Sequence, residues 1–257
     1  MYKIKNKIIL SNSDCLESMK NIKDKSIDMI LCDLPYGTTA CKWDTVIPFE
    51  PLWEQYNRII KDNGAIVLFG TQPYSSKLIN SNLKMFKYEL IWDKKIGGAF
   101  VLAKKRPLPR HENILIFYKN KPTYNPQMKE RKKENIRPSN KGSRQSEALP
   151  VSSGLAKSSS NYYNTKIYPT SIIEISSKIK ECNPINRVHP TQKPVALLEY
   201  LIKTYTNENE TVLDNCMGSG STGVAAINTN RNFIGIELSE EYYNIAKERI
   251  EKISLEG

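Results

Sequence analysis

The residue types that could do chemistry fall in two short segments, and the first is Asp33-Leu34-Pro35-Tyr36. This tetrapeptide stands at the end of an apolar, strand-like stretch. The Asp33 carboxylate and the Leu34 carbonyl, held by the rigid Pro35 ring, can both accept hydrogen bonds from one amino group. Tyr36 can stack on a planar base drawn out of a duplex. The pattern favours recognition of such a base over the alternative, a strand-ending turn with a packed aromatic ring.

The second segment, 213–223, is rich in glycine and lies between a predicted strand and a predicted helix. Gly218 and Gly220 allow the backbone to turn tightly and approach a ligand, and the helix start offers free N–H groups. About twenty residues further on, Glu237 ends the next apolar run, where a carboxylate can accept hydrogen bonds from ribose hydroxyls. This spacing favours a nucleotide site over a plain tight turn.

The elements that must position these segments alternate between strands and helices. Apolar runs predict strands at 7–10, 27–32, 65–69, 88–92, 114–118, 211–213 and 233–237. Helical spacing, capping residues and proline positions predict helices at 15–20, 51–61, 194–204, 222–227 and 240–253. Between 119 and 187 the periodicity gives way to Pro, Ser, Asn and Lys, which indicates an insertion. The alternation predicts an α/β fold with a mostly parallel sheet and helices on both faces.

The composition is that of a globular protein with a surplus of positive charge. The 257 residues include 38 Lys and Arg against 27 Asp and Glu, a net charge of +11. Such a surplus attracts polyanions and favours nucleic acid as the partner, although a ribosome-associated protein or an AT-rich genome would also explain it. No apolar stretch approaches the roughly 18 residues of a membrane span, and the first apolar run is too short for a signal peptide. We therefore expect a soluble, cytoplasmic protein with no membrane partner.

The five cysteines are odd in number and form no Cys-x-x-Cys pair. We expect buried, reduced thiols, with neither a disulfide framework nor a metal site. Carbon-5 methylation of cytosine would need a nucleophilic cysteine after a proline, and no Pro-Cys dipeptide occurs. Covalent catalysis by Cys32 is therefore not expected.

Taken together, these segments resemble the amino-methyltransferases that modify DNA, of the permuted β group. In that family the catalytic tetrapeptide is Asp/Asn/Ser-Pro-Pro-Tyr/Phe/Trp, and Leu34 replaces its first proline here. The family's cofactor loop resembles Asp-Pro-Phe-x-Gly-Ser-Gly-Thr-Thr, from which Asn215 and Cys216 depart. The tetrapeptide precedes the glycine loop, which is the order of the β group.

Three further segments are similar to this family. The string at 189–194, His-Pro-Thr-Gln-Lys-Pro, resembles the segment that holds the carboxylate end of the cofactor, S-adenosyl-L-methionine. The string at 13–17 resembles the segment whose aspartate approaches the cofactor adenine, and 110–113 resembles a segment near the target base. The resemblance makes the tetrapeptide, Asp33, Leu34, Pro35 and Tyr36, catalytic. It assigns the cofactor to Asp14, Cys15, Thr191, Gln192, Lys193, Asp214, Asn215, Met217, Gly218, Ser219, Gly220 and Glu237, and it implies no metal.

The fold implied by the resemblance is a Rossmann-like methyltransferase fold with a mostly parallel seven-stranded sheet and circularly permuted motifs. Residues 1–120 would form the catalytic half, 121–187 a target-recognition insertion and 188–257 the cofactor-binding half. Lys129 to Lys133 and Arg137, inside the insertion, are candidate phosphate ligands.

The implied reaction transfers a methyl group from S-adenosyl-L-methionine to the exocyclic amine of adenine in double-stranded DNA after base flipping. Asp33 favours adenine through family usage, and the exocyclic amine of cytosine remains open. A restriction endonuclease partner also remains open, as does the choice between monomer and homodimer. Direct transfer needs no histidine base, so His111 and His189 are expected to order loops.

Two other classes of function are weighed against this reading. A non-catalytic nucleic-acid-binding module is disfavoured by the intact Asp33 and Tyr36. Methylation of RNA or of a protein glutamine uses the same type of tetrapeptide. In those families, however, the cofactor loop normally precedes it.

Overall fold

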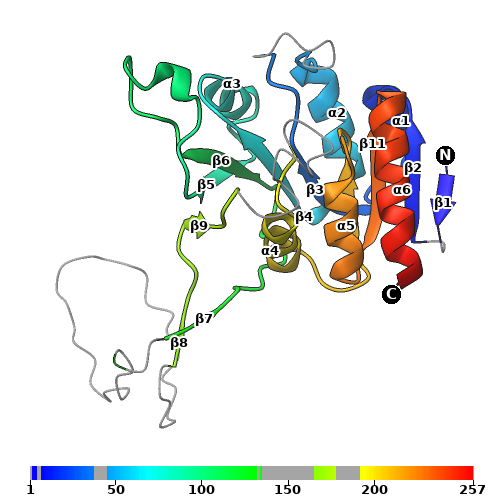
Figure 1. Ribbon diagram of the computed structural model, residues 1–257. Helices are drawn as coiled ribbons and strands as arrows, with labels where there is room; N and C mark the ends of the chain where they lie inside the picture. Colours follow the sequence, from blue (N-terminus) through cyan, green and yellow to red (C-terminus); the bar gives the residue numbers. More distant parts are fainter. Residues whose placement is uncertain are drawn as a thin grey trace. The chain divides into compact units, whose positions relative to one another are not determined.

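The structure, a computed structural model, describes residues 2–4, 7–37, 45–131, 134, 165–177 and 192–256 (Figure 1). The chain divides into two compact units. The first unit joins Met1–Asn125 to Thr170–Gly257, and the second is Pro126–Pro169. Each unit is described by itself.

The first unit is built on a nine-stranded sheet in the order β1-β2-β11-β10-β3-β4-β6-β5-β9. Its strands are β1 (Tyr2–Ile4), β2 (Ile8–Asn12), β3 (Ile27–Cys32), β4 (Ile60–Gly70), β5 (Phe86–Asp93), β6 (His111–Phe117), β9 (Ile172–Glu174), β10 (Thr211–Asp214) and β11 (Asn232–Glu237). The strands from β2 to β4 in this order run parallel, and β9 is parallel to β5. β6 is antiparallel to β4 and β5, and β1 is antiparallel to β2. The mostly parallel seven-stranded sheet is confirmed, and β1 and β9 extend its two edges.

Helices connect these strands on both faces. They are α1 (Cys15–Lys20), α2 (Phe49–Ile59), α3 (Tyr74–Ser81), α4 (Val195–Tyr205), α5 (Ser221–Asn228), α6 (Glu240–Glu256) and the short 3-10 helix η1 (Phe100–Leu102). Each predicted helix is present within a few residues of its expected bounds, and α3 and η1 are additions to the predicted set. The predicted first helical residue Pro194 is instead the N-cap of α4.

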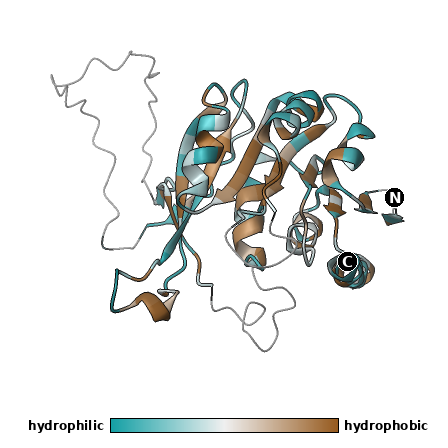
Figure 2. Ribbon diagram, turned by 90° about the horizontal axis from the view of Figure 1, so that it is seen from above, coloured by the Kyte–Doolittle hydropathy of each residue, from teal (hydrophilic) through white to brown (hydrophobic). Residues whose placement is uncertain are grey.

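Two hydrophobic cores lie on opposite faces of the sheet. β3 is buried at all six positions, and because successive side chains of a strand point to opposite faces, it contributes to both cores. Met29 and Leu31 pack in the core that includes buried residues of α4, α5 and α6. Ile30 and Cys32 pack in the core that includes buried residues of α1, α2 and α3. Figure 2 shows the resulting arrangement, with brown strands between helices whose outer faces are teal.

The parallel strands bring four acidic residues to one edge of the sheet. Asp14 follows β2, Asp33 follows β3, Asp214 ends β10 and Glu237 ends β11. These strands are neighbours in the sheet and run in the same direction, so their carboxyl ends lie at the same edge. Open α/β sheets bind their ligands at this edge.

The second unit contains a two-stranded antiparallel ribbon of β7 (Lys129–Glu130) and β8 (Lys166–Ile167). This unit lies within the predicted insertion, 121–187, whose role in target recognition stays a prediction. Of the candidate phosphate ligands, Lys129 is exposed, whereas Lys132, Lys133 and Arg137 fall outside the described residues. Among the described helices of the chain, none is long and apolar enough to cross a membrane.

A candidate active site at the carboxyl edge of the sheet

A cavity of about 520 Å³ opens at the carboxyl edge of the sheet in the first unit. It is lined by residues from five places: the β2–α1 turn, the end of β3, the β10–α5 loop, the end of β11 and the segment before α4. The predicted site residues among its lining are Asp14, Cys15, Asp33, Leu34, Pro35, Tyr36, Gln192, Lys193, Asp214, Asn215, Met217, Gly218, Ser219 and Glu237. Gly220 is not part of the lining, and Thr191 falls outside the described residues, as does His189.

The glycine loop between β10 and α5 has the tight backbone that its sequence predicts. Gly218 and Gly220 have φ angles of 51° and 80°, in the left-handed region that favours glycine. A Cβ atom on Gly220 would lie 2.9 Å from the Cβ of Ala246 in α6. Gly220 therefore allows α6 to pack closely against the loop, while Gly218 faces the cavity.

Glu237 holds the glycine loop through its carboxylate. Its Oε2 accepts a hydrogen bond of 2.8 Å from the Gly218 N–H, and its Oε1 accepts one of 2.9 Å from the Ser239 N–H. The side chain is nearly buried, and burial raises the pKa of Glu237 above its usual value. Each carboxylate oxygen can accept a second hydrogen bond, so a hydroxyl in the cavity can still bind here.

Asp214 and Asn215 fix the start of the same loop. Asp214 accepts hydrogen bonds from the Thr222 hydroxyl at 2.6 Å and from the Cys216 N–H at 3.1 Å, and burial raises the pKa of Asp214 to about 6. The Asn215 side-chain oxygen accepts a hydrogen bond of 2.5 Å from the buried hydroxyl of Tyr56 in α2. The departure from the family pattern at Asn215 is thus accommodated by a buried polar contact.

Asp14 caps the first helix. Its carboxylate accepts hydrogen bonds from the Leu16 N–H at 2.8 Å and the Glu17 N–H at 3.1 Å, which is the usual role of aspartate at an N-cap. Asp14 also lines the cavity, so its free oxygen can face a ligand while the other holds the helix.

Three free cysteines lie beside the cavity: Cys15, Cys32 and Cys216. Burial raises the pKa of Cys32 to about 12, so this thiol stays protonated near neutral pH and is a poor nucleophile. The structure therefore agrees with a reaction that does not use Cys32 covalently. Cys41 and Cys182 lie outside the described residues. The described part of the chain contains no cluster of His, Cys, Asp and Glu suited to a metal ion.

The catalytic tetrapeptide belongs to a buried network of charges. Lys193 Nζ lies 2.5 Å from Asp33 Oδ2 and 3.0 Å from Glu112 Oε1. The Tyr36 hydroxyl lies within hydrogen-bonding distance of both acids, 2.6 Å from Asp33 Oδ1 and 2.9 Å from Glu112 Oε1. Lys94 Nζ completes the network at 2.8 Å from Glu112 Oε2. Two ammonium groups thus balance two carboxylates around the Tyr36 hydroxyl.

The charges in this network support one another. Burial raises the pKa of Asp33, and Lys193 opposes that rise. Burial also disfavours the charge of Glu112, but Lys193 and Lys94 outweigh it and lower the pKa of Glu112 to about 2. Burial likewise disfavours the charge of Lys193, but Asp33 and Glu112 outweigh it and raise the pKa of Lys193. Lys193 is therefore a fixed cation between two carboxylates.

Sequence reasoning did not foresee this network. It placed Lys193 with the cofactor and Glu112 only near the target base, whereas the structure joins both side chains to Asp33 and Tyr36. The available signal was a glutamate at the start of the apolar run 114–118, because an acid next to a buried strand needs a cation. The identity of that cation could not be read from the sequence.

The fold and the site together define a class of protein. A mostly parallel sheet, a glycine loop after β10 and an acid at the end of the neighbouring β11 make a Rossmann-like fold with a nucleotide-type site. The particular family follows from comparison: the model of the DNA methylase family matches residues 27–248, and the chain belongs to that family. The predicted family and the predicted methyltransferase fold are thereby confirmed.

Individual relatives agree with this assignment. The type II methyltransferase M.HpaI of Haemophilus parainfluenzae is 31% identical over 93% of this chain and 73% of its own length. The DNA adenine methyltransferase YhdJ of Escherichia coli is 28% identical over 95% of this chain and 82% of its own length. The crystal structure of an M1.HpyAVI–SAM complex matches with a TM-score of 0.62 and 27% identity, over 95% of this chain and 98% of that one. The cytosine-N4-specific PvuII DNA methyltransferase, at 16% identity and a TM-score of 0.63, covers 96% of this chain and 93% of its own and supports the fold alone.

Proposed function

We propose that this protein transfers the methyl group of S-adenosyl-L-methionine to the exocyclic amine of adenine in double-stranded DNA. One observation carries the proposal: the Asp33 carboxylate and the Tyr36 ring line the same cavity as the glycine loop and Glu237. An amine acceptor and a nucleotide-type site therefore share one space. Two observations support adenine over cytosine: aspartate at position 33 and the likeness to an adenine methyltransferase at 28% identity.

The residues of the cavity fit this cofactor. A volume of about 520 Å³ lies within the roughly 300–1,000 Å³ of small-molecule sites. Glu237 is placed to accept hydrogen bonds from ribose hydroxyls, and the Gly218 backbone leaves room for a ligand to approach. Asp14 is placed for the adenine end and Gln192 for the carboxylate end. When bound, the cofactor supplies an electrophilic methyl group on sulfur.

The tetrapeptide would orient the target amine. Asp33 and the Leu34 carbonyl accept its two hydrogens, and the Asp33 contact strengthens as positive charge develops on the amine nitrogen. Tyr74 packs on the Tyr36 ring with centroids 4.9 Å apart, and the Tyr36 hydroxyl is held by Asp33 and Glu112. The ring is therefore fixed before a base arrives, and stacking needs little reorganisation.

Lys193 would control the charge state of Asp33. A buried carboxylate is a good acceptor only while it is ionised, and burial alone raises its pKa. The adjacent ammonium keeps Asp33 charged at neutral pH. Lys193 is therefore proposed as a positioning residue for the catalytic side, in addition to lining the cofactor cavity.

The division of the chain into a catalytic half, a target-recognition insertion and a cofactor-binding half is part of the same proposal. Both junctions of the second unit are held by the first. The Asn125 N–H donates to the Thr204 carbonyl at 2.8 Å, and β9 pairs with β5. A restriction endonuclease partner and the choice between monomer and homodimer stay predictions.

The test is transfer of radiolabelled methyl groups from S-adenosyl-L-methionine to DNA, followed by digestion to nucleosides. We expect the label in N6-methyladenine. Label in N4-methylcytosine would replace adenine by the second candidate base. Label only in RNA or in protein would contradict the proposal.

A further inference from the structure

The loop between β5 and β6, residues 94–110, combines strong positive charge with an exposed apolar tip. It contains six Lys and Arg residues and no Asp or Glu. At its tip, in η1, Phe100 is 70% exposed and Val101 is 93% exposed, the highest value among the described large hydrophobic residues. Figure 2 shows this tip as a short brown segment on a teal loop. An apolar pair held out in water among cations calls for a partner.

Hydrogen bonds give this loop a defined shape. The Lys94 N–H donates to the Arg110 carbonyl at 3.0 Å and the Gly98 N–H donates to the Pro109 carbonyl at 2.9 Å, which extends the β5–β6 hairpin. At the tip, the Leu102 N–H donates to the Ala99 carbonyl at 2.9 Å. The apolar residues are thus presented by an ordered arm, so little conformational entropy is lost on binding.

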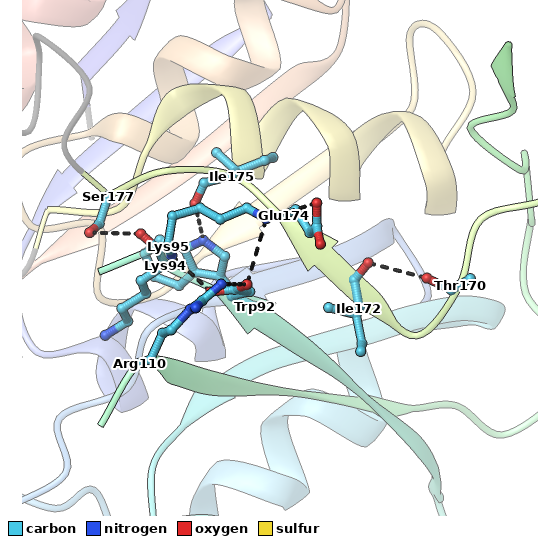
Figure 3. A network of polar contacts seen from close by, with 10 residues as sticks. Trp92, Lys94, Lys95, Arg110, Thr170, Ile172, Glu174, Ile175 and Ser177 are labelled. Atoms are coloured by element: carbon cyan, nitrogen blue, oxygen red, sulfur yellow. Dashed lines mark hydrogen bonds and ion pairs between the residues drawn. The ribbon is translucent and has the colours of Figure 1, made fainter. Parts of the chain in front are cut away.

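Ion pairs fasten the base of the loop to the sheet (Figure 3). The Arg110 guanidinium donates two hydrogen bonds to the Asp93 carboxylate, at 2.7 and 2.6 Å. Lys95 Nζ lies 2.8 Å from Glu174 of β9, and Lys94 Nζ lies 2.8 Å from Glu112. Glu112 in turn contacts the Tyr36 hydroxyl, so the loop begins two side chains away from the proposed base-binding ring.

The remaining cations lie beside the tip. Lys104, Lys105 and Arg106 follow η1 directly, are exposed, and form no ion pair with any described residue. Because β5 runs parallel to β4, the loop rises from the carboxyl edge that also carries Asp33. Three cations, an apolar tip and the proposed active site therefore share one edge of the sheet.

We propose that this loop is a DNA-opening arm in which Phe100 and Val101 enter the base stack beside the target base. Lys104, Lys105 and Arg106 would bind the flanking phosphates and position the tip. Apolar side chains inserted between base steps unstack a duplex, and phosphate contacts hold the protein in place while they do so. The arm would thus favour extrusion of the base toward Tyr36. This inference rests on the proposed function, because it requires a duplex DNA substrate.

The test compares a paired substrate with one that is already open. The variant carries Phe100→Ser and Val101→Ser, and its duplexes contain the methylated site, first identified by sequencing, with the target base either paired or opposite an abasic position. We expect methylation of the paired duplex to slow by roughly tenfold to a hundredfold, and that of the open duplex by less than about threefold. The matched control is Leu83→Ser, which alters a 62% exposed residue before β5, at the opposite edge, and should behave like the parent on both duplexes.

Two further measurements separate the outcomes. A duplex with 2-aminopurine at the target position reports base extrusion by fluorescence without turnover, and the double variant should lose most of the signal of the parent. Replacing Lys104, Lys105 and Arg106 by Gln should reduce the salt dependence of DNA affinity by about 0.9 per phosphate contact in the log–log slope.

Equal slowing on both duplexes, or no slowing on the paired one, would overturn the arm. A change of oligomeric state in the double variant would also overturn it, because the tip would then be a contact between copies. A parent protein that transfers no methyl group to any DNA contradicts the proposed function instead, and the fluorescence signal still decides whether the tip opens a duplex.

Discussion

The two sides of the cavity are held by different kinds of interaction. On the cofactor side, Glu237, Asp214 and Asp14 are fixed by backbone N–H groups and neighbouring hydroxyls. On the catalytic side, Asp33 is fixed by a lysine 160 residues away in the chain. The first kind of site is built locally at strand ends, whereas the second exists only once the sheet has assembled. The cofactor side should therefore respond to substitution mainly in affinity, and the catalytic side in turnover and stability.

The largest expected effect is that of Asp33→Ala on turnover. This change removes the acceptor whose contact tightens as the amine becomes positive, while Pro35 and Tyr36 still hold the loop. We expect a loss of roughly 3–4 kcal/mol in transition-state stabilisation, or about a few hundredfold to a thousandfold in kcat. Cofactor and DNA affinities, measured by calorimetry and filter binding, should change little. Turnover within about tenfold of the parent would mean that Asp33 is not the amine acceptor.

Lys193→Met should lower both stability and the useful pH range. Without the cation, two buried carboxylates face each other, and the free energy of unfolding should fall by about 3 kcal/mol. The pKa of Asp33, already raised by burial, should rise further. Protonated Asp33 is a poor acceptor, so the acid limb of the kcat profile should move to higher pH.

A matched ion pair supplies the control for Lys193. Lys61 Nζ lies 2.6 Å from Asp28 Oδ1, but the Lys61 side chain is 40% exposed against 10% for Lys193. Lys61→Met should therefore cost no more than about 1 kcal/mol and leave the pH profile in place. Lys193→Arg, which keeps the charge, should keep the acid limb near that of the parent. An unmoved limb in Lys193→Met would contradict control of Asp33 by this lysine.

The same contrast explains what the sequence could predict. The glycine loop, Glu237 and the tetrapeptide were recognisable because each is a local pattern at the end of an apolar run. The pairing of Lys193 with Glu112 was not, because β6 enters the sheet antiparallel between β4 and β5, and no local pattern encodes that position. Within the fold, α3 was missed because its buried face holds only Tyr74, Ser75 and Leu78, too few apolar residues to set a helical period.

Short elements were missed for a related reason. β1 and β9 have three residues each and lie at the edges of the sheet. Their strand conformation comes from pairing with β2 and β5 rather than from a repeating apolar pattern. In contrast, the helix at 51–61 was predictable because Trp53, Tyr56 and Ile59 recur on one face, and all three are buried in α2.

On the cofactor side, Glu237→Ala should weaken cofactor binding by about 2 kcal/mol, since it removes a charged acceptor for ribose hydroxyls and frees two backbone N–H groups. Turnover at saturating cofactor should survive. Glu237→Gln, which keeps the shape and one acceptor oxygen, should fall between parent and alanine variant. Calorimetric titration that finds the same affinity in all three proteins would remove Glu237 from the site.

The smallest effect tests whether the cofactor loop depends on one buried contact beyond the backbone. Tyr56→Phe removes the hydroxyl that donates to Asn215, and it leaves a buried acceptor unsatisfied at a cost of about 1–2 kcal/mol in unfolding free energy. Because Asn215 lines the cavity, cofactor affinity should fall severalfold. Tyr205→Phe is the matched control, since Tyr205 is also buried and its hydroxyl lies 2.9 Å from that of Tyr88, in the other core. The two variants should lose similar stability in denaturant titrations, but only Tyr56→Phe should lose cofactor affinity. Equal affinities in both would mean that the loop is held by its backbone contacts alone, and that Asn215 is an ordinary core residue.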